Sequence, residues 1–558
     1  MARPSEGHER VTETDFDVVV IGAGPVGLAL AIELGMRDIR VLLAERNSRG
    51  GMAPRAKTTN VRTRTHLRRW GIADTLAAAS PLGIGYPNDT HFTTGLSGHK
   101  LALFRNCFNA APDRADAYPE HAQWVPQYTL EQVMLEYART LPNVEIRFDT
   151  TFDTAHQEDG IVVTSLAPLV GGAIIVTSRY LVGADGARSA VRDLIGATME
   201  GTYGIGRHSN VVFRAPGLAQ AHDQGLGVMY LQLGPGGMSI VGPMDAGDIW
   251  YFGSAAKEDE PLSDEMVVEQ IKQTTGIDLP YEILSADQWV ASALIADRYR
   301  QGRIVLAGDA CHLHPPFGGY GMNMGIGDSV DLGWKIAAEL QGWGGADLVD
   351  SYEAERKPVH LFVIEEAIAN HAMMIAPMWR DGLDADTPEG ESLRQEVGAR
   401  LQASKGREYH TLGTVLGLCY EHSPIIDSEP GPVPRQDGQV YTPSARPGCL
   451  APHMWLDDGR SLYDAFGPGF ALVVADSAAE DEVALAEAEA RELGVAFEIV
   501  RPGDRTPLLY RAELTLVRPD QHVAWRGRRW DGALRRALAL EPSRTSLETV
   551  DAAASMEG

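Results

Sequence analysis

The residue types with the most informative spacing lie at positions 308–323, which read GDACHLHPPFGGYGMN. An apolar run at 304–307 precedes this segment and predicts a strand, and the apolar positions at 328–340 predict a helix. Asp309 therefore stands just after a strand, where its carboxylate can accept hydrogen bonds from a chain of hydroxyl groups. The Gly/Pro loop that follows allows bare backbone N–H groups to approach a flat, electron-rich ring.

A second segment has the spacing that phosphate binding requires. Gly22, Gly24 and Gly27 form a GxGxxG pattern between a predicted strand and a predicted helix. The first glycine permits a tight turn, the second lets the backbone approach a pyrophosphate, and the third lets helix and strand pack closely. The helix that begins near Pro25 offers N–H groups and the positive end of its dipole to the phosphates. Glu45 ends the next predicted strand and can accept hydrogen bonds from ribose hydroxyls, so this segment predicts dinucleotide binding.

A third segment contains Asp185 and Gly186 within GADGARS, again between a predicted strand and a predicted helix. GxGxxG alone does not distinguish NAD from FAD, and the other two segments decide between them. In this order the three segments match the motifs of the class A flavin-dependent aromatic monooxygenases, which have the p-hydroxybenzoate hydroxylase-like fold. The amino-acid sequence at positions 308–323 closely resembles that of the phenol hydroxylase and 2,4-dichlorophenol 6-monooxygenase branch. The resemblance is strong over residues 15–375 and looser over 449–530.

The resemblance implies FAD as the cofactor and assigns roles to single residues. Arg55 would lie near the flavin phosphates and the path of the nicotinamide, and Pro316 beside the flavin ring. The backbone amides of Met322 and Asn323 would stabilise negative charge on the reduced ring. The implied cofactor-binding residues are Gly22, Gly24, Pro25, Gly27, Glu45, Arg46, Arg55, Gln127, Asp185, Gly186, Asp309, Pro316, Gly319, Gly321, Met322 and Asn323.

The resemblance also implies a reaction. NAD(P)H reduces FAD, O2 adds to form the flavin C4a-hydroperoxide, and an OH group is delivered to a phenolic or hydroxypyridine-type ring, ortho or para to its oxygen. The sequence identifies no catalytic base, and Tyr203, His208 and Tyr230 are candidates for contacts with the substrate. Two alternatives stay open: a tailoring hydroxylase of a polyketide or antibiotic, and a non-catalytic flavin-binding regulatory protein.

Composition limits the partners. The chain has 558 residues, with 76 acidic and 49 basic side chains and a formal net charge of -27. Nucleic acids and anionic membranes need clustered positive charge, so we expect neither as a partner. A small aromatic substrate and a homo-oligomer are expected instead. The uncharged apolar run at 18–32 is interrupted by glycines and is too short to span a bilayer.

Cysteine and histidine spacing gives two further expectations. The four cysteines, Cys107, Cys311, Cys419 and Cys449, show no CxxC pattern, which indicates reduced structural thiols in a cytoplasmic protein. His312 and His314 lack the helical spacing of metal ligands, so no metal is expected. His312 is expected to brace the loop.

The elements that must position these residues predict an α/β protein. A Rossmann-like FAD-binding domain is interleaved with a mostly antiparallel β-sheet substrate domain, and a C-terminal α/β domain resembles a thioredoxin-like one. The expected divisions are flexible tails at 1–14 and 541–558, an FAD-binding domain at 15–80, 126–205 and 290–400, a substrate-binding domain at 81–125 and 206–289, a linker at 401–448, and the thioredoxin-like domain at 449–540.

Overall fold

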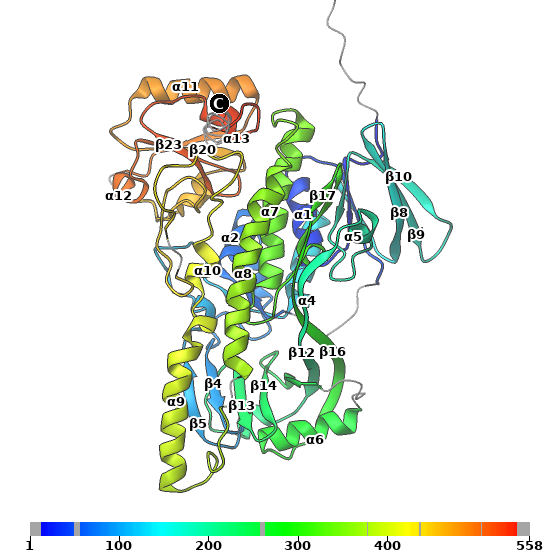
Figure 1. Cartoon of the computed structure of the whole chain (residues 1–558), viewed down its shortest axis with the longest axis vertical. Coiled ribbons are helices and arrows are strands. Elements are labelled where there is room, and N and C mark those ends of the chain that lie inside the picture. The colour runs from blue at the N-terminus through cyan, green and yellow to red at the C-terminus, as the bar shows by residue number, and fades with distance from the viewer. Residues whose placement is uncertain are drawn as a thin grey trace, which may run out of the picture.

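The structure is a computed structural model and describes residues 13–48, 56–256, 263–375, 378–434, 437–503 and 505–543. Arg55 and most of the two expected tails lie outside the described residues. Figure 1 shows the C-terminal domain at one end of the molecule and a large antiparallel sheet at the other, with the long helices α7 (Gly321–Gln341) and α8 (Ser351–Ile375) between them.

A six-stranded sheet in the order β17-β18-β11-β1-β2-β7 contains the predicted motifs. Five of its strands are parallel, and β17 is antiparallel to β18. The central strands are short apolar runs that are buried throughout, as in parallel sheets covered on both faces. The strands are β1 (Val18–Ile21), β2 (Val41–Ala44), β7 (Val144–Arg147), β11 (Tyr180–Gly183), β17 (Arg300–Gln301) and β18 (Ile304–Leu306).

Helix α1 (Pro25–Gly35) packs against α7 and against α4 (Gln127–Ala138). The helix expected at 328–340 begins seven residues earlier, at Gly321. Gly325 explains this extension, because a Cβ there would come within 2.6 Å of the Val26 side chain, so the two helices approach closely. Ser329 also donates a 2.7 Å hydrogen bond to the Val26 carbonyl. Tertiary packing thus overrides the low helix propensity of the glycines.

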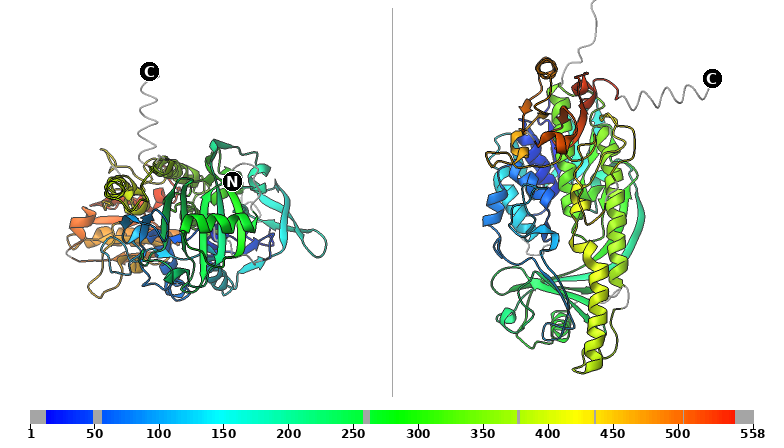
Figure 2. Two further views of the ribbon diagram at one scale, coloured as in Figure 1. Left: turned by 90° about the horizontal axis from the view of Figure 1, so that it is seen from below. Right: turned by 90° about the vertical axis from the view of Figure 1, so that its left-hand side faces the viewer.

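An eight-stranded, mostly antiparallel sheet has the order β19-β16-β12-β15-β14-β13-β4-β5. Its longest strands, β12 and β16, extend from this sheet into the half of the molecule that holds the parallel sheet (Figure 2). β12 begins at Met199 and β16 ends at Ala296, so the sheet extends beyond the expected boundaries at 206 and 289. The strands are β4 (Thr90–Thr93), β5 (Lys100–Phe104), β12 (Met199–Arg214), β13 (Met229–Gly234), β14 (Gly237–Pro243), β15 (Ile249–Ala255), β16 (Glu282–Ala296) and β19 (His312–Leu313).

Smaller elements complete this part of the chain. A two-stranded ladder pairs β3 with β6, and a three-stranded sheet of β8, β9 and β10 projects from the side of the molecule (Figure 1). Helix α9 lies along β5. The remaining bounds are β3 (Thr58–Thr59), α2 (Val61–Arg69), α3 (Ala73–Ala78), β6 (Gln123–Trp124), β8 (Thr150–Glu158), β9 (Ile161–Pro168), β10 (Ile174–Ser178), α5 (Ala190–Leu194), α6 (Asp264–Thr275), α9 (Pro388–Tyr409) and α10 (Leu412–Leu416).

The C-terminal domain is built on a four-stranded sheet, β21-β20-β22-β23, in which β20 and β21 are parallel and β22 is antiparallel to its neighbours. Its core continues into α7, where Trp334 meets Phe470 edge-on with ring centroids 5.8 Å apart. The thioredoxin-like assignment stays a prediction. The elements are β20 (Phe470–Val474), α11 (Glu480–Leu493), β21 (Phe497–Val500), α12 (Thr506–Tyr510), β22 (Leu514–Val517), β23 (Val523–Gly527) and α13 (Ala533–Ala537).

The expectation of four reduced thiols is wrong for two of them. Cys419 and Cys449 form a disulfide across a bridge between two backbone segments, although 30 residues separate them in sequence. Sequence spacing cannot show such a pair, because the fold alone brings the two segments together. Cys107 and Cys311 are free and buried. Among the helices within the described residues, none is long and apolar enough to cross a membrane.

Candidate active site

A cavity of about 2270 Å³ is lined by the ends of the parallel strands, by the segment after β18 and by one face of the eight-stranded sheet. The topology explains why the three motifs meet there. β18, β11, β1 and β2 are parallel neighbours, so their carboxyl ends lie at one edge of the sheet. Each motif follows one of these ends, and ligands of such sheets bind at that edge.

The glycine pattern after β1 shapes the turn into α1. Gly22 has φ +101°, and a Cβ there would lie 2.4 Å from the Ala184 carbonyl oxygen. A Cβ on Gly27 would lie 1.8 Å from the Gly22 carbonyl oxygen, so Gly27 is required for close packing and does not itself line the cavity. Gly24 lines the cavity, and a Cβ there would meet nothing within 4 Å. The space beside Gly24 fits a pyrophosphate approaching the start of α1.

Two carboxylates flank this turn. Glu45 lines the cavity, and its Oε2 accepts a 2.9 Å hydrogen bond from the Ala23 N–H. Its Oε1 accepts from the backbone and side chain of Asn47, at 3.0 and 2.9 Å. Asp185 accepts from the Ala190 N–H at 2.8 Å, while its buried Oδ1 has no hydrogen-bond partner among the described residues. Burial raises the pKa of Asp185, although its hydrogen bonds oppose the shift.

The segment after β18 lines the cavity between the six-stranded sheet and the eight-stranded sheet. Gly318 and Gly319 have φ of +93° and +66°, which favours glycine, and they lead into the first turn of α7. The first N–H groups of a helix have no intrahelical acceptor, so those of Met322 and Asn323 have none within α7. The Asn323 side chain points away from the cavity lining and donates to the carbonyls of Thr58 (2.9 Å) and Gly319 (2.7 Å).

Asp328 of α7 is the centre of a buried polar cluster that contacts the segment after β18. Its Oδ2 accepts from the Gly308 N–H (3.1 Å) and from His312 Nε2 (2.7 Å). Its Oδ1 accepts from Arg356 Nε and His360 Nε2, both at 2.8 Å. Burial alone would raise the pKa of Asp328, but His360, Arg356 and His312 outweigh it and hold the pKa well below its usual range. The cluster fixes Gly308, and with it the direction of Asp309.

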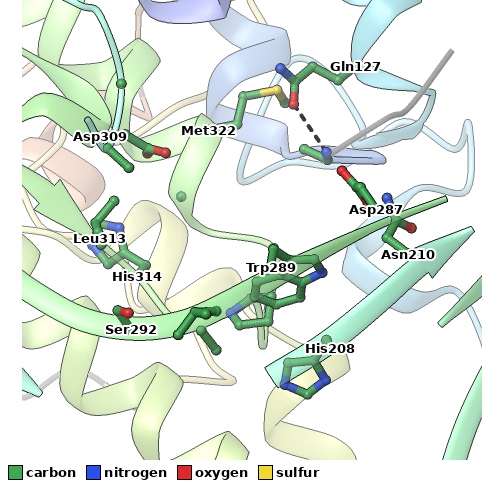
Figure 3. A pocket seen from close by; sticks show the side chains of 18 of the residues that line it. Gln127, His208, Asn210, Asp287, Trp289, Ser292, Asp309, Leu313, His314 and Met322 are labelled. Atoms are coloured by element: carbon green, nitrogen blue, oxygen red, sulfur yellow. Dashed lines mark hydrogen bonds between the residues drawn. The ribbon is translucent and has the colours of Figure 1, made fainter. Parts of the chain in front are cut away.

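The predicted cofactor residues are distributed as follows. Gln127 lies at the start of α4, and its Oε1 accepts a 3.1 Å hydrogen bond from the Ala56 N–H (Figure 3). Arg55 lies outside the described residues. The predicted residues that line the cavity are Gly22, Gly24, Pro25, Glu45, Arg46, Gln127, Asp185, Gly186, Asp309, Pro316, Gly319, Gly321 and Met322.

The three predicted substrate residues separate in the structure. His208 lines the cavity and stacks on Trp289, with ring centroids 4.8 Å apart. Tyr203 also lines the cavity, and 69% of the surface of this residue is exposed. Tyr230 lies on the opposite face of β13, where its hydroxyl donates to the Gly225 carbonyl at 2.7 Å. Successive residues of a strand alternate between faces, and its neighbours Met229 and Leu231 line the cavity. The structure therefore places Tyr230 away from the cavity.

The structure also brings in residues that the sequence analysis did not identify. Lys57, Asn210, Asp287 and Trp289 line the cavity. Asn210 of β12 and Asp287 of β16 are partners in the sheet register and project together in Figure 3. Lys57 is two residues after Arg55 in the chain, so its proximity to a predicted cofactor-binding residue was a usable signal. The sequence could not identify Asn210, Asp287 and Trp289, because the register of β12 and β16 decides which of their side chains lie together.

Dinucleotide motifs on parallel strands, at the edge of a cavity that an antiparallel sheet also lines, are the arrangement of an oxidoreductase whose dinucleotide cofactor and substrate share one cavity. The family model for the FAD binding domain matches residues 15–367, and that for the C-terminal domain of aromatic-ring hydroxylases matches residues 444–540. The chain belongs to the FAD-dependent aromatic-ring monooxygenases. It is an enzyme that uses FAD, NAD(P)H and O2 to hydroxylate an aromatic ring.

Similar proteins span nearly the whole chain. Aklavinone 12-hydroxylase DnrF of Streptomyces peucetius is 33% identical over 83% of this chain and 92% of its own length. The 2,4-dichlorophenol 6-monooxygenase of Delftia acidovorans is 29% identical over 96% of this chain and 100% of its own length. RebC with bound 7-carboxy-K252c has a TM-score of 0.87 at 30% identity, over 94% of this chain and 99% of RebC. Aklavinone-11 hydroxylase with FAD and aklavinone has a TM-score of 0.82 at 31% identity, over 95% and 100%.

Proposed function

We propose that the enzyme hydroxylates a phenolic or hydroxypyridine-type ring, ortho or para to the ring oxygen, at the face of the eight-stranded sheet that lines the cavity. One observation carries the proposal: a single cavity joins the edge where the dinucleotide motifs converge to a sheet surface of apolar and aromatic side chains. A ring placed on that surface is close to the segment 316–322, and water is excluded by the surrounding apolar side chains.

The same proposal gives the cofactor-lining residues their roles. The space at Gly24 and the start of α1 would hold the pyrophosphate, Glu45 the adenosine ribose, and Asp309 the ribityl hydroxyls. The free N–H groups of Met322 and Asn323 would stabilise negative charge at the end of the flavin ring. When bound, FAD carries electrons from NAD(P)H to O2 and supplies one oxygen atom to the ring. The protein holds and orients both molecules.

The size of the cavity favours a second candidate within this chemistry. Single drug-sized ligands occupy about 300–1,000 Å³, whereas this cavity measures about 2270 Å³. It therefore has room for a dinucleotide and a substrate of several fused rings. A tailoring hydroxylase of a polycyclic aromatic product is that candidate, and the similarity to the aklavinone hydroxylases supports it.

The experiment is a substrate panel with the FAD-loaded protein. Single-ring phenols and hydroxypyridines form one set, polycyclic phenols such as anthraquinones the other, and each is tested with NADH and with NADPH. We expect aromatic-dependent NAD(P)H consumption with one equivalent of ring-hydroxylated product, identified by mass spectrometry after incubation under labelled O2. Consumption that yields only hydrogen peroxide with both sets would contradict the proposal.

Two further properties are proposals. A cytoplasmic location is supported by the need for NAD(P)H. A homo-oligomer is proposed as well, and size-exclusion chromatography with light scattering would test it.

A further inference from the structure

We propose that Lys57, with Asp287 beside it, is the group that ionises the substrate hydroxyl and holds the resulting phenolate against the eight-stranded sheet. The inference rests on the proposed function, which requires a phenolic oxygen, and adds the residue that activates it. The sequence motifs identified no such base.

Lys57 is held between the cofactor segment and the substrate sheet. Its carbonyl accepts a 2.8 Å hydrogen bond from the Val125 N–H. The next residue, Thr58, accepts from the Asn323 side chain at 2.9 Å, and a Cβ on Gly319 would come within 3.2 Å of the Thr58 Cβ. Lys57 is therefore one residue from the contact between β3 and the segment that lines the proposed flavin site.

The Lys57 ammonium lies over an aromatic ring. Its Nζ is 4.2 Å from the centroid of the Tyr251 ring, and Lys57 forms no direct ion pair with another of the described residues. The Tyr251 hydroxyl donates to the Val228 carbonyl at 3.1 Å, and burial raises its pKa well above the usual value, so it stays neutral. Lys57 is half-buried at the cavity lining, where a cation without an ion-pair partner is less stable than in water, and an anionic ligand in the cavity would supply that partner.

Asp287 adjusts the proton affinity of Lys57. Burial lowers the pKa of Lys57 to about 8, and the charge of Asp287 partly opposes this shift. The buried Oδ1 of Asp287 accepts no hydrogen bond among the described residues. In Figure 3, Asp287 and Asn210 lie near the hydrogen bond between Gln127 and the backbone of Ala56, one residue from Lys57. Asp287 is thus a positioning residue that also stabilises the protonated lysine.

Five other charged or titratable groups that line the cavity suit this role less well. Arg46 and Arg188 belong to the dinucleotide motifs, and burial lowers the pKa of His208, which favours its neutral form. Glu408 and Tyr409 of α9 also line the cavity, and burial raises the pKa of Tyr409 well above its usual value. Arg46 and Arg188 follow strands of the parallel sheet, so none of the five is a cation on the eight-stranded sheet.

The proton transfer balances without a further reactant. With Lys57 neutral, the substrate O–H bond breaks, its electron pair stays on oxygen, and the proton forms a third N–H bond at Nζ. The products are a phenolate and an ammonium in contact, with no change in total charge. With Lys57 already protonated, it binds a phenolate that ionised in solution. The ionised oxygen donates electron density to the ortho and para carbons, so the substrate class is a phenol with a free hydroxyl.

The test measures ionisation directly with 4-nitrophenol bound to the FAD-loaded protein. The phenolate absorbance is followed from pH 5 to 9. An opposite charge in contact lowers the pKa of a bound acid by about 1–3 units, so we expect nitrophenol to ionise at least about tenfold more readily on the parent protein than in water. Lys57→Met should abolish this shift, Lys57→Arg should retain it, and Asp287→Asn should alter its size.

The matched control is Lys100→Met, because Lys100 is an exposed lysine at the start of β5 in the same sheet and should leave the shift unchanged. FAD content and melting temperature of every variant show whether it has folded. An unchanged shift in folded Lys57→Met, or no saturable binding of nitrophenol to the parent, overturns the inference.

Failure of the proposed function is distinguishable from failure of this inference. A protein that ionises nitrophenol through Lys57 but hydroxylates no phenol contradicts the function and retains the site. A protein that hydroxylates phenols, with the same nitrophenol shift in parent and Lys57→Met, contradicts the inference alone.

Discussion

At the scale of single residues, the cluster around Asp328 shows how a buried charge can hold a binding segment in place. The carboxylate is stable there only while its donors are present and correctly protonated, because a buried charge needs its partners. Its connection to Gly308 then links the protonation of the cluster to the geometry of the cavity. The cluster should therefore make the fold sensitive to acid.

We predict that stability falls between pH 7 and pH 5, in part through His360. Burial lowers the pKa of His360 to about 3, whereas an unfolded histidine titrates near about 6.5. Between these values the unfolded chain binds a proton that the folded chain excludes, so stability is full above this window and falls as the pH decreases. The loss from this one group between pH 7 and pH 5 is about 2 kcal/mol. Urea unfolding at each pH measures it.

His360→Gln provides the comparison, because glutamine offers an N–H to Asp328 and does not titrate. It should lose less stability than the parent over the same pH interval. His156→Gln, at an imidazole that is 62% exposed, should behave as the parent does. An acid response in His360→Gln equal to that of the parent would contradict the prediction.

The residues that sequence could identify are those whose role depends on neighbours in sequence. Glu45 and Asp309 follow strand ends, so their places at the sheet edge were predictable. Lys57 and Asp287 have their environment set by a cavity that distant segments form. Tyr230 was predicted to contact the substrate, but which face of β13 lines the cavity depends on how that strand pairs in the sheet. The local sequence shows that Lys57 is close to Arg55, but not which distant residues surround it.

At the scale of elements, the start of α1 separates two functions of glycine. Gly24→Ala should leave the stability of the apoprotein nearly unchanged, since its Cβ meets nothing within 4 Å. It should weaken FAD binding, because the methyl group would occupy space proposed for the pyrophosphate. Gly27→Ala should destabilise the apoprotein itself, because its Cβ would lie 1.8 Å from a carbonyl oxygen.

Melting of the apoproteins and FAD titration by fluorescence quenching distinguish the two variants. We expect Gly24→Ala to lose roughly tenfold in affinity, equivalent to about 1.4 kcal/mol. Normal FAD affinity in Gly24→Ala would show that the pyrophosphate lies elsewhere.

The order of most elements was predictable, because strands and helices alternate with clear turn signals. The start of α7 was not, since residues 321–327 contain three glycines and form a helix only by packing on α1 and around Asp328. The two-residue strands β3 and β6 were also beyond prediction, as a ladder so short depends entirely on its partner.

At the scale of the whole molecule, the C-terminal domain is joined to the long helices by a buried ionic network. Arg518, in the turn between β22 and β23, contacts Glu355 of α8 at 2.5 Å and Asp331 of α7 at 2.9 Å. Lys335 contacts the same two carboxylates at 2.6 and 2.8 Å. Burial alone would raise the pKa of Glu355, but Arg518 and Lys335 outweigh it and lower the pKa to about 2.

We predict that Arg518→Met destabilises the protein by about 3–5 kcal/mol, the usual cost of removing one partner from a buried ion pair. Chemical denaturation would measure the loss. Arg528→Met, at a side chain that is 85% exposed, should change stability little. Adding Glu355→Gln to Arg518→Met should recover part of the loss, and its failure to do so would show that charge imbalance is not the cause.

The order of strands in the parallel sheet also has a consequence for synthesis on the ribosome. β1 and β2 are synthesised first. β11, which pairs with β1, follows more than 130 residues after β2. β18, which pairs with β11, follows more than 110 residues after β11. At roughly 5–20 residues per second, the interval from β1 to β18 is about a quarter of a minute to a minute. Unpaired strand edges are open to wrong pairing during this time. With the role proposed for Asp309, the complete FAD site forms only at the end of this interval, because the segment with Asp309 follows β18 in the chain.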